Sequence, residues 1–212
     1  TNIPIRWYGL LFALAFVSAY FIMRWVYRRE GRTMRELDDL TLYVGLGTII
    51  GARLGHCLFY EPAYYLQNPL DILKVWQGGL ASHGAAIGII LAVWLFYRKH
   101  KTNIFWLFDR LSLVVPLSGM FVRLGNLANS EIYGRVTELP WGFYFLRSKE
   151  ISHHIEPHHP TQIYEALAYL LIFFTLLYLY KKGILLKSKG STFGLFLILL
   201  FVARFLIEFV KE

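Results

Sequence analysis

The stretch WLFDRLSLVVPLSGMFV (Trp106–Val122) leads directly into RLGNLANSEIYGR (Arg123–Arg135). The first part is long and apolar enough to be most of a membrane span. The second part places an arginine, two asparagines and a glutamate at the mouth of that span. Polar groups at such depth are costly and are usually kept for a function. This stretch therefore predicts a membrane protein with a functional site at one end of the helix.

The composition extends this prediction to the whole chain. Of the 212 residues, 56% are hydrophobic and 17% are aromatic, and about 20 apolar residues cross the hydrocarbon core of a bilayer. We predict an all-α, polytopic integral membrane bundle that forms a single domain over residues 1–212. The six expected spans are Pro4–Val26, Leu40–Tyr60, Gly79–Tyr97, Trp106–Asn126, Pro160–Tyr180 and Thr192–Val210.

Glycines recur at every fourth position in two of these spans. They are Gly47, Gly51 and Gly55 in the second span, and Gly84 and Gly88 in the third. Small residues at this spacing let membrane helices approach closely, so we expect these glycines to pack helices.

The net charge of +8 is distributed unevenly along the chain. Most lysines and arginines of the connections follow the first, third and fifth spans. By the positive-inside rule these connections are cytoplasmic, the N-terminus faces outward, and the loop of residues 129–159 is extracytoplasmic. A nucleic-acid surface would need the charges gathered on one folded face, so nucleic acid is not an expected partner.

This orientation places most ionisable residues of the spans in the outer half of the membrane. Those that bear on the site are Arg53, His56, His83, Arg123, Glu165, Arg204 and Glu208, accompanied by Tyr8, Asn126, Gln162 and Tyr164. Such a convergence indicates a polar cavity within the bundle. Arginine binds phosphate with two donors at once, and apolar walls can receive acyl chains. We interpret the cavity as a site for a phosphate-bearing lipid headgroup.

Several of these residues also have plainer interpretations. Arg53 could be a structural arginine that reaches toward the headgroups, Arg204 with Glu208 an internal ion pair, and His83 a satisfied core histidine. The pairs His153-His154 and His158-His159 raise the alternative of a metal site. Adjacent histidines do not supply helical ligand spacing, however, and the sequence has no HExxH motif.

Three motifs together resemble the bacterial prolipoprotein diacylglyceryl transferases. They are GLASHG at Gly79–Gly84, the stretch Arg123–Arg135 and HPTQIYE at His159–Glu165. The resemblance implies transfer of the diacylglyceryl group of phosphatidylglycerol to the lipobox cysteine of a prolipoprotein signal peptide, with glycerol phosphate leaving. It further implies a location in the bacterial cytoplasmic (inner) membrane, a site open to the extracytoplasmic side, and no cofactor or metal.

The implied chemistry gives the candidates their roles. A free thiol has a pKa of about 8.5 and needs a base; His83 is the candidate. Arg123 is expected to hold the leaving phosphate. Tyr8 is counted with these two as catalytic, and it would line the pocket. Substrate contacts are expected, besides Arg123, from Asn126, Asn129, Glu131, Gly134, His158, Tyr164, Glu165, Arg53 and Arg204.

Two departures from the family pattern carry consequences. His158 stands where an arginine is usual, so a phosphate contact there would be charged only when the imidazole is protonated. Alternatively, His158 is a solvated loop residue, and Arg53 or Arg204 supplies the second contact. The family also has one more helix after Thr192–Val210, so we expect a truncated chain.

Two other classes of protein are alternatives. A transporter of anions or lipids would also place arginines in a membrane cavity, although inverted repeats and broken helices are typical of that class. A structural scaffold would not need Arg123, His83 and Glu165 together.

The charge distribution makes a testable prediction about topology. In a Cys57-free background, cysteines at Gln67 and Ser148 should react with an impermeant thiol reagent in intact cells, after permeabilisation of any outer membrane. The reason is that both positions lie in connections poor in lysine and arginine. Labelling that requires lysis of the inner membrane would reverse the orientation.

Overall fold

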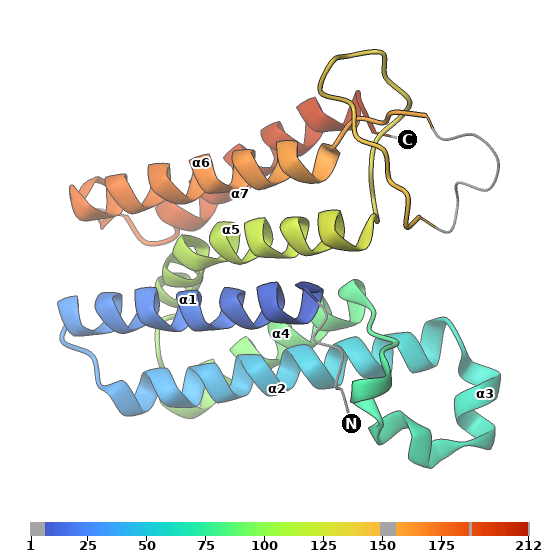
Figure 1. The fold of residues 1–212 in the computed structure, drawn as a ribbon. Helices are drawn as coiled ribbons and strands as arrows, with labels where there is room; N and C mark the ends of the chain where they lie inside the picture. Colours follow the sequence, from blue (N-terminus) through green and yellow to red (C-terminus); the bar gives the residue numbers. More distant parts are fainter. Residues whose placement is uncertain (1–6, 149–155, 187, 212) are drawn as a thin grey trace. The chain divides into compact units, whose positions relative to one another are not determined.

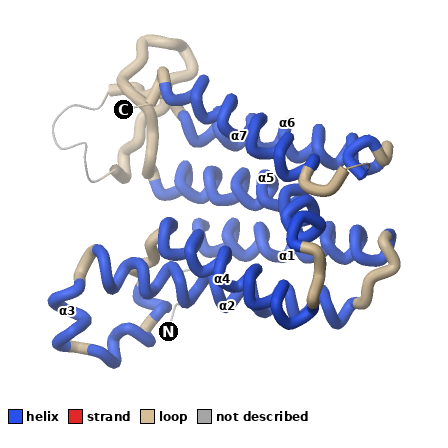
Figure 2. Tube along the Cα trace, turned by 180° about the vertical axis from the view of Figure 1, so that it is seen from behind, coloured by secondary structure: helices blue, strands red, loops and turns tan. Residues whose placement is uncertain are grey.

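The computed structural model describes residues 7–148, 156–186 and 188–211 (Figure 1). These residues form helices joined by loops, and Figure 2 shows no strand among them. The elements are α1 (Trp7–Arg29), α2 (Met34–Phe59), α3 (Pro62–Gln67), the 3-10 helices η1 (Pro69–Leu73) and η2 (Val75–Gln77), α4 (Ser82–His100), α5 (Ile104–Asn129), α6 (Thr161–Lys181), η3 (Ile184–Leu186) and α7 (Ser191–Glu208). The all-α prediction is confirmed for the described part of the chain.

Five of the described helices are long and apolar enough to cross a membrane. They are α1, α2, α5, α6 and α7. α4 lies outside this set, because His83 near its start and Arg98 and Lys99 near its end lower its mean hydropathy. The protein is thus a polytopic membrane helical bundle.

The chain divides into two compact units. The first consists of residues 1–26 and 105–212, and the second of residues 27–104. The second unit therefore contains α2, α3 and α4, and the first contains α5, α6, α7 and most of α1.

The helix boundaries differ by a few residues from the apolar runs that predicted them. α2 begins at Met34, six residues before the expected Leu40, because Thr33 caps it: the Thr33 hydroxyl accepts the Glu36 backbone N–H at 3.3 Å. Arg32 adds an ion pair to Glu36, also at 3.3 Å. Hydropathy marks the length of a helix that is inside lipid, whereas capping marks where the helix itself begins.

The connection after α2 contains short helical segments, which its hydropathy did not predict. α3 and η1 each carry a proline at the first turn, at Pro62 and Pro69. Proline fits there because the first N–H groups of a helix have no intrahelical partner. Helices this short leave no periodic apolar pattern from which to predict them.

The predicted glycine packing is confirmed in the second unit, where α2 and α4 lie side by side. A Cβ atom on Gly47 would lie 2.6 Å from the Gly88 carbonyl oxygen, and one on Gly55 would lie 2.7 Å from the Gly84 Cα. Only residues without a side chain allow this backbone-to-backbone approach.

The first unit has an apolar core between α5, α6 and α7. Leu113, Tyr169, Leu176 and Phe196 are buried in it. At one end of this core the buried Asp109 of α5 caps α7. Its carboxylate accepts the Gly190 N–H at 2.7 Å and the Phe193 N–H at 2.9 Å. A carboxylate is well suited to this place, because the first N–H groups of a helix carry a partial positive charge.

The glycine interface can be tested by adding one methyl group. Gly51→Ala should lower the thermal unfolding midpoint in detergent, since the new Cβ would lie 2.8 Å from the Gly88 Cα. Overpacking of this kind costs about 1–3 kcal/mol.

Gly45→Ala, on the same helix, is the matched control, because nothing lies within 4 Å of its added Cβ. Equal midpoints for the two variants would contradict close packing of α2 on α4.

Candidate active site

A buried carboxylate surrounded by cations forms the centre of the site. The side chain of Glu165 is 1% exposed. Its Oε2 pairs with Arg123 Nε, its Oε1 pairs with Arg204 Nη1, and Lys211 Nζ lies 3.3 Å from Oε1. A buried carboxylate is stable only when it is paired and hydrogen-bonded in this way. We call these four residues the Glu165 cluster.

Each member of the cluster comes from a different segment. Glu165 lies in the second turn of α6, Arg123 near the end of α5, Arg204 near the end of α7, and Lys211 just after α7. The end of α7 is also bound to the loop after α5: Gly134 and Lys211 form a β-bridge, and the Arg135 N–H donates to the Val210 oxygen at 3.2 Å. Backbone pairing therefore holds Lys211 at the cluster.

The C-terminal end of α5 stops in a specific turn. The Glu131 N–H donates to the Asn126 oxygen at 2.9 Å, and the Ser130 N–H donates to the Leu127 oxygen at 3.0 Å. This pair of bonds is a Schellman motif, with Ser130 in the left-handed position (φ 58°) where glycine is usual. The turn ends the helix and brings Glu131 back over its last residues.

Two predicted site residues thereby become partners of Glu131. Asn126 Nδ2 donates to its carboxylate at 3.4 Å, and Asn129 Nδ2 donates to it at 3.2 Å. The Asn126 Oδ1 accepts a hydrogen bond from Arg123 Nη1 at 3.3 Å. A polar chain thus links the exposed Glu131 through Asn126 to the Glu165 cluster.

Tyr8 and Gly134 occupy packed positions in the same unit. A Cβ atom on Gly125 would lie 2.8 Å from Tyr8 Cδ2, so the phenol ring of Tyr8 lies against α5 beside Asn126. A Cβ atom on Gly134 would lie 2.7 Å from Thr161 Cγ2. Gly134 therefore allows close contact between the loop and the start of α6.

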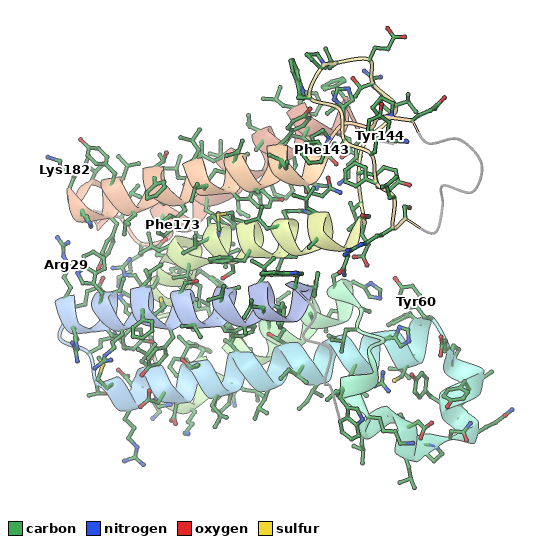
Figure 3. All side chains as sticks on the ribbon, in the orientation of Figure 1. Arg29, Tyr60, Phe143, Tyr144, Phe173 and Lys182 are labelled. Carbon is green, nitrogen blue, oxygen red and sulfur yellow. The ribbon has the colours of Figure 1, made fainter. Side chains whose placement is uncertain are left out.

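The loop between α5 and α6 contains an aromatic cluster, and Figure 3 labels Phe143 and Tyr144 on this loop. Tyr133 stacks on Phe145 and meets His158 edge-on, each at a centroid distance of 4.8 Å. His158 is 7% exposed, so the alternative that it is a solvated loop residue is wrong. Its Nδ1 lies 2.8 Å from the Gly134 oxygen. Because a carbonyl oxygen only accepts, Nδ1 carries the proton.

His159 and Tyr164 form a second chain of polar contacts. Trp141 Nε1 donates to the Tyr164 hydroxyl oxygen at 2.8 Å, and that hydroxyl lies 3.2 Å from His159 Nδ1. Burial, and then the positive charge of Arg135, lowers the pKa of His159 below its usual value. Both causes favour the neutral imidazole, whose Nδ1 can accept a hydrogen bond from the Tyr164 hydroxyl.

Arg53 and His83 belong to the second unit. Arg53 is buried, and its guanidinium donates to the carbonyl oxygens of Asp71 (2.6 Å), Ile72 (2.9 Å), Gly78 (2.6 Å) and Gly79 (3.2 Å). These bonds hold the connection between α2 and α4 together. A phosphate contact by Arg53 stays a prediction, but its donors already have backbone partners.

His83 lies in the first turn of α4 and is exposed. Its ring stacks on Tyr60 at 5.7 Å and meets Phe59 edge-on at 5.5 Å. The interpretation of His83 as a satisfied core histidine is therefore wrong. The two ring contacts orient the imidazole, and the residue stays exposed.

A metal site has no support within residues 7–148, 156–186 and 188–211. No group of three or more histidine, cysteine, aspartate or glutamate side chains there could hold a metal ion. His153 and His154, which raised that alternative, lie outside the described residues.

Sequence reasoning missed two contributors to the site. Lys211 carries the third positive charge of the Glu165 cluster, and Trp141 orients Tyr164. Lys211 gave a weak signal: it follows Arg204 by seven residues, which is close to two helical turns. Trp141 gave none, because its partner is 23 residues away.

Comparison with known proteins places this chain in a family context. A family model described as Prolipoprotein diacylglyceryl transferase matches residues 1–212. A relative from Tolumonas auensis, named phosphatidylglycerol--prolipoprotein diacylglyceryl transferase, is 51% identical over 99% of this chain and 79% of its own length. Relatives of the same name from Porphyromonas gingivalis and Chloroherpeton thalassium are 48% and 45% identical, over 98% and 99% of this chain and 76% of each relative.

The Glu165 cluster predicts a large effect of a small change. Glu165→Gln keeps the shape of the side chain but removes the only buried carboxylate that the described contacts give to Arg123 and Lys211. Breaking one partner of a buried pair costs about 3–5 kcal/mol, so the thermal unfolding midpoint in detergent should fall strongly.

Glu208→Gln is the control, because Glu208 is 62% exposed and lies 3.7 Å from Arg204. If Glu165→Gln were as stable as Glu208→Gln, the cluster would not contribute to folding stability.

Proposed function

The chain belongs to the prolipoprotein diacylglyceryl transferase family, and we propose that the Glu165 cluster is where its lipid substrate binds. The protein is a transferase that moves the diacylglyceryl group of a phospholipid to a prolipoprotein. Phosphatidylglycerol and prolipoprotein signal peptides with a lipobox cysteine are the proposed partners.

The charge of the cluster is the observation that carries this proposal. Arg123, Arg204 and Lys211 converge on the single buried carboxylate of Glu165, and the exposed Glu208 adds a second carboxylate 3.7 Å from Arg204, which leaves an excess of one positive charge. Such an excess inside a membrane bundle is unfavourable unless an anion compensates it. A phosphodiester supplies one negative charge, and the phosphate monoester that leaves supplies two at full ionisation.

The reaction itself creates the charge that this cluster can stabilise. The cysteine thiolate attacks the glycerol carbon that bears the phosphate, the S–C bond forms, and the C–O bond breaks. Its electron pair goes to the phosphate oxygen, so the negative charge of the sulfur ends on glycerol phosphate. Cations preorganised at that oxygen lower the barrier, since the charge develops there in the transition state.

Arg123 and Arg204 are the proposed phosphate clamp. Both guanidinium groups are partly exposed and have a carboxylate partner that a phosphate can replace or join. His158 is not proposed as a contact, because it is buried and its Nδ1–H is bound to Gly134. Its role is to hold the loop.

Other residues are proposed to transfer the proton and to position the headgroup. His83 is the proposed base for the thiol, because its ring is exposed and held by Tyr60. Asn126, Asn129 and Glu131 would bind the hydroxyls of the headgroup glycerol, since two amide donors already orient that carboxylate. Tyr8 and Tyr164 would line the pocket.

The proposed orientation follows the lysine and arginine distribution. α4 serves as a sixth span in addition to the five described ones, the N-terminus faces outward, and the site opens to the extracytoplasmic side of a bacterial inner membrane. In this orientation, the cluster meets lipid headgroups of the outer leaflet.

Arg123→Lys tests the proposed clamp. It should reduce transfer to a lipobox peptide at least a hundredfold while the protein stays folded, because lysine keeps the charge but lacks the planar fork that grips phosphate. The measurement is the mass gain of the peptide cysteine with phosphatidylglycerol in detergent micelles, with the unfolding midpoint recorded in parallel.

Arg98→Lys, at the end of α4, is the control and should be fully active. Near-normal activity of Arg123→Lys would exclude bidentate binding. Movement of lipid by the native protein without modification of the peptide would favour a transporter instead.

A further inference from the structure

We propose that Thr161 and Gln162 are positioning residues, which hold the Glu131 carboxylate in place for the headgroup glycerol. This inference rests on the proposed function, because it takes Glu131 as the residue that contacts the glycerol hydroxyls. It adds two side chains that make no contact with the substrate themselves.

The turn that carries Glu131 is strained. Ser130 and Ile132, on either side of Glu131, both have φ 58°. This left-handed region is unfavourable for residues with a side chain, and most of all for a β-branched residue such as isoleucine. A strained turn of this kind persists only when the surrounding structure holds it.

The first turn of α6 supplies what holds it. Gln162 Nε2 donates to the Glu131 carbonyl oxygen at 2.7 Å, and Thr161 Oγ1 donates to the Ile132 carbonyl oxygen at 3.1 Å. Both donor residues are 0% exposed, so the lost bond would leave a buried polar side chain without this partner. Two consecutive carbonyl groups are thus fixed by two consecutive side chains.

The orientation of the Gln162 amide is determined by this contact. Its Oε1 is buried without a hydrogen-bond partner among the described residues. Reversing the amide would set Oε1 against the Glu131 carbonyl oxygen, and two acceptors repel each other. The Gln162 amide thus keeps its Nε2–H bond to Glu131 and leaves its buried Oε1 unsatisfied, which is costly. This arrangement indicates that the bond helps to hold the Glu131 backbone in place.

The same helix face also carries Glu165. Gln162 and Glu165 are three residues apart, so they lie on one side of α6. One helix turn therefore positions two groups. It holds Glu131, which is proposed to contact the headgroup, and it carries Glu165, whose cluster is proposed to bind the phosphate. The spacing between these two groups is set by α6, which gives selectivity for a headgroup with hydroxyls at that distance from its phosphate.

The test removes each bond with little change of shape. Thr161→Val and Gln162→Met should each raise the apparent KM for phosphatidylglycerol about tenfold, the effect of losing one buried hydrogen bond, and leave kcat nearly unchanged. Thr161→Ser, which keeps the hydroxyl, should behave like the native protein. Thr175→Val is the matched control, because the Thr175 hydroxyl donates to the Leu171 oxygen of its own helix.

A second substitution separates positioning from mere stability. Glycine adopts φ 58° without strain, so Ile132→Gly in the Thr161→Val background should restore most of the KM. Failure of this rescue, or a native KM in Thr161→Val and Gln162→Met, would overturn the proposal.

Glu131→Gln separates this inference from the function beneath it. A raised KM in Glu131→Gln with native values for Thr161→Val and Gln162→Met would remove the positioning role alone. A native KM in Glu131→Gln would remove both the headgroup contact and the inference, while transfer activity with phosphatidylglycerol would still report on the clamp.

Discussion

The burial of one carboxylate, that of Glu165, is the constraint on which the site depends. A charged group with 1% exposure is tolerated only if opposite charges accompany it. Arg123, Arg204 and Lys211 therefore have to reach α6 from α5, from α7 and from the residues after α7. The requirement to neutralise Glu165 fixes the start of α6 against the C-terminal ends of α5 and α7. The same requirement brings three cations to one place.

A second buried carboxylate acts at the other end of α7. Asp109 accepts the N–H groups of Gly190 and Phe193, so the helix is held at its start by α5 and near its end by α6. Apolar packing between these helices is not directional within lipid, because lipid tails are as apolar as the side chains. The two polar anchors therefore set the register of α7, and the apolar core fills the space between them.

The sequence predicted what depends on local pattern and missed what depends on distant partners. Hydropathy located the long helices, and the four-residue spacing of Gly47, Gly51 and Gly55 predicted close helix packing, which the structure shows between α2 and α4. It did not predict the early start of α2, which a threonine cap decides, or α3, which is too short for a period. The contacts of Lys211 and Trp141 were not predicted, because each joins residues far apart in the sequence.

The arginines show why depth in the membrane alone does not identify a substrate contact. Arg53 and Arg123 were placed at similar depth, but the structure gives them different partners. Arg53 donates to four backbone carbonyl groups, and a phosphate could take those donors only by releasing the connection between α2 and α4. Arg123 pairs with a carboxylate, an anion whose oxygens resemble those of phosphate in charge and geometry. If a phosphate replaces the carboxylate partner of Arg123, no backbone contact is lost. If a phosphate replaces the carbonyl partners of Arg53, the connection between α2 and α4 loses its support. These contacts favour Arg123 over Arg53 as the proposed phosphate contact.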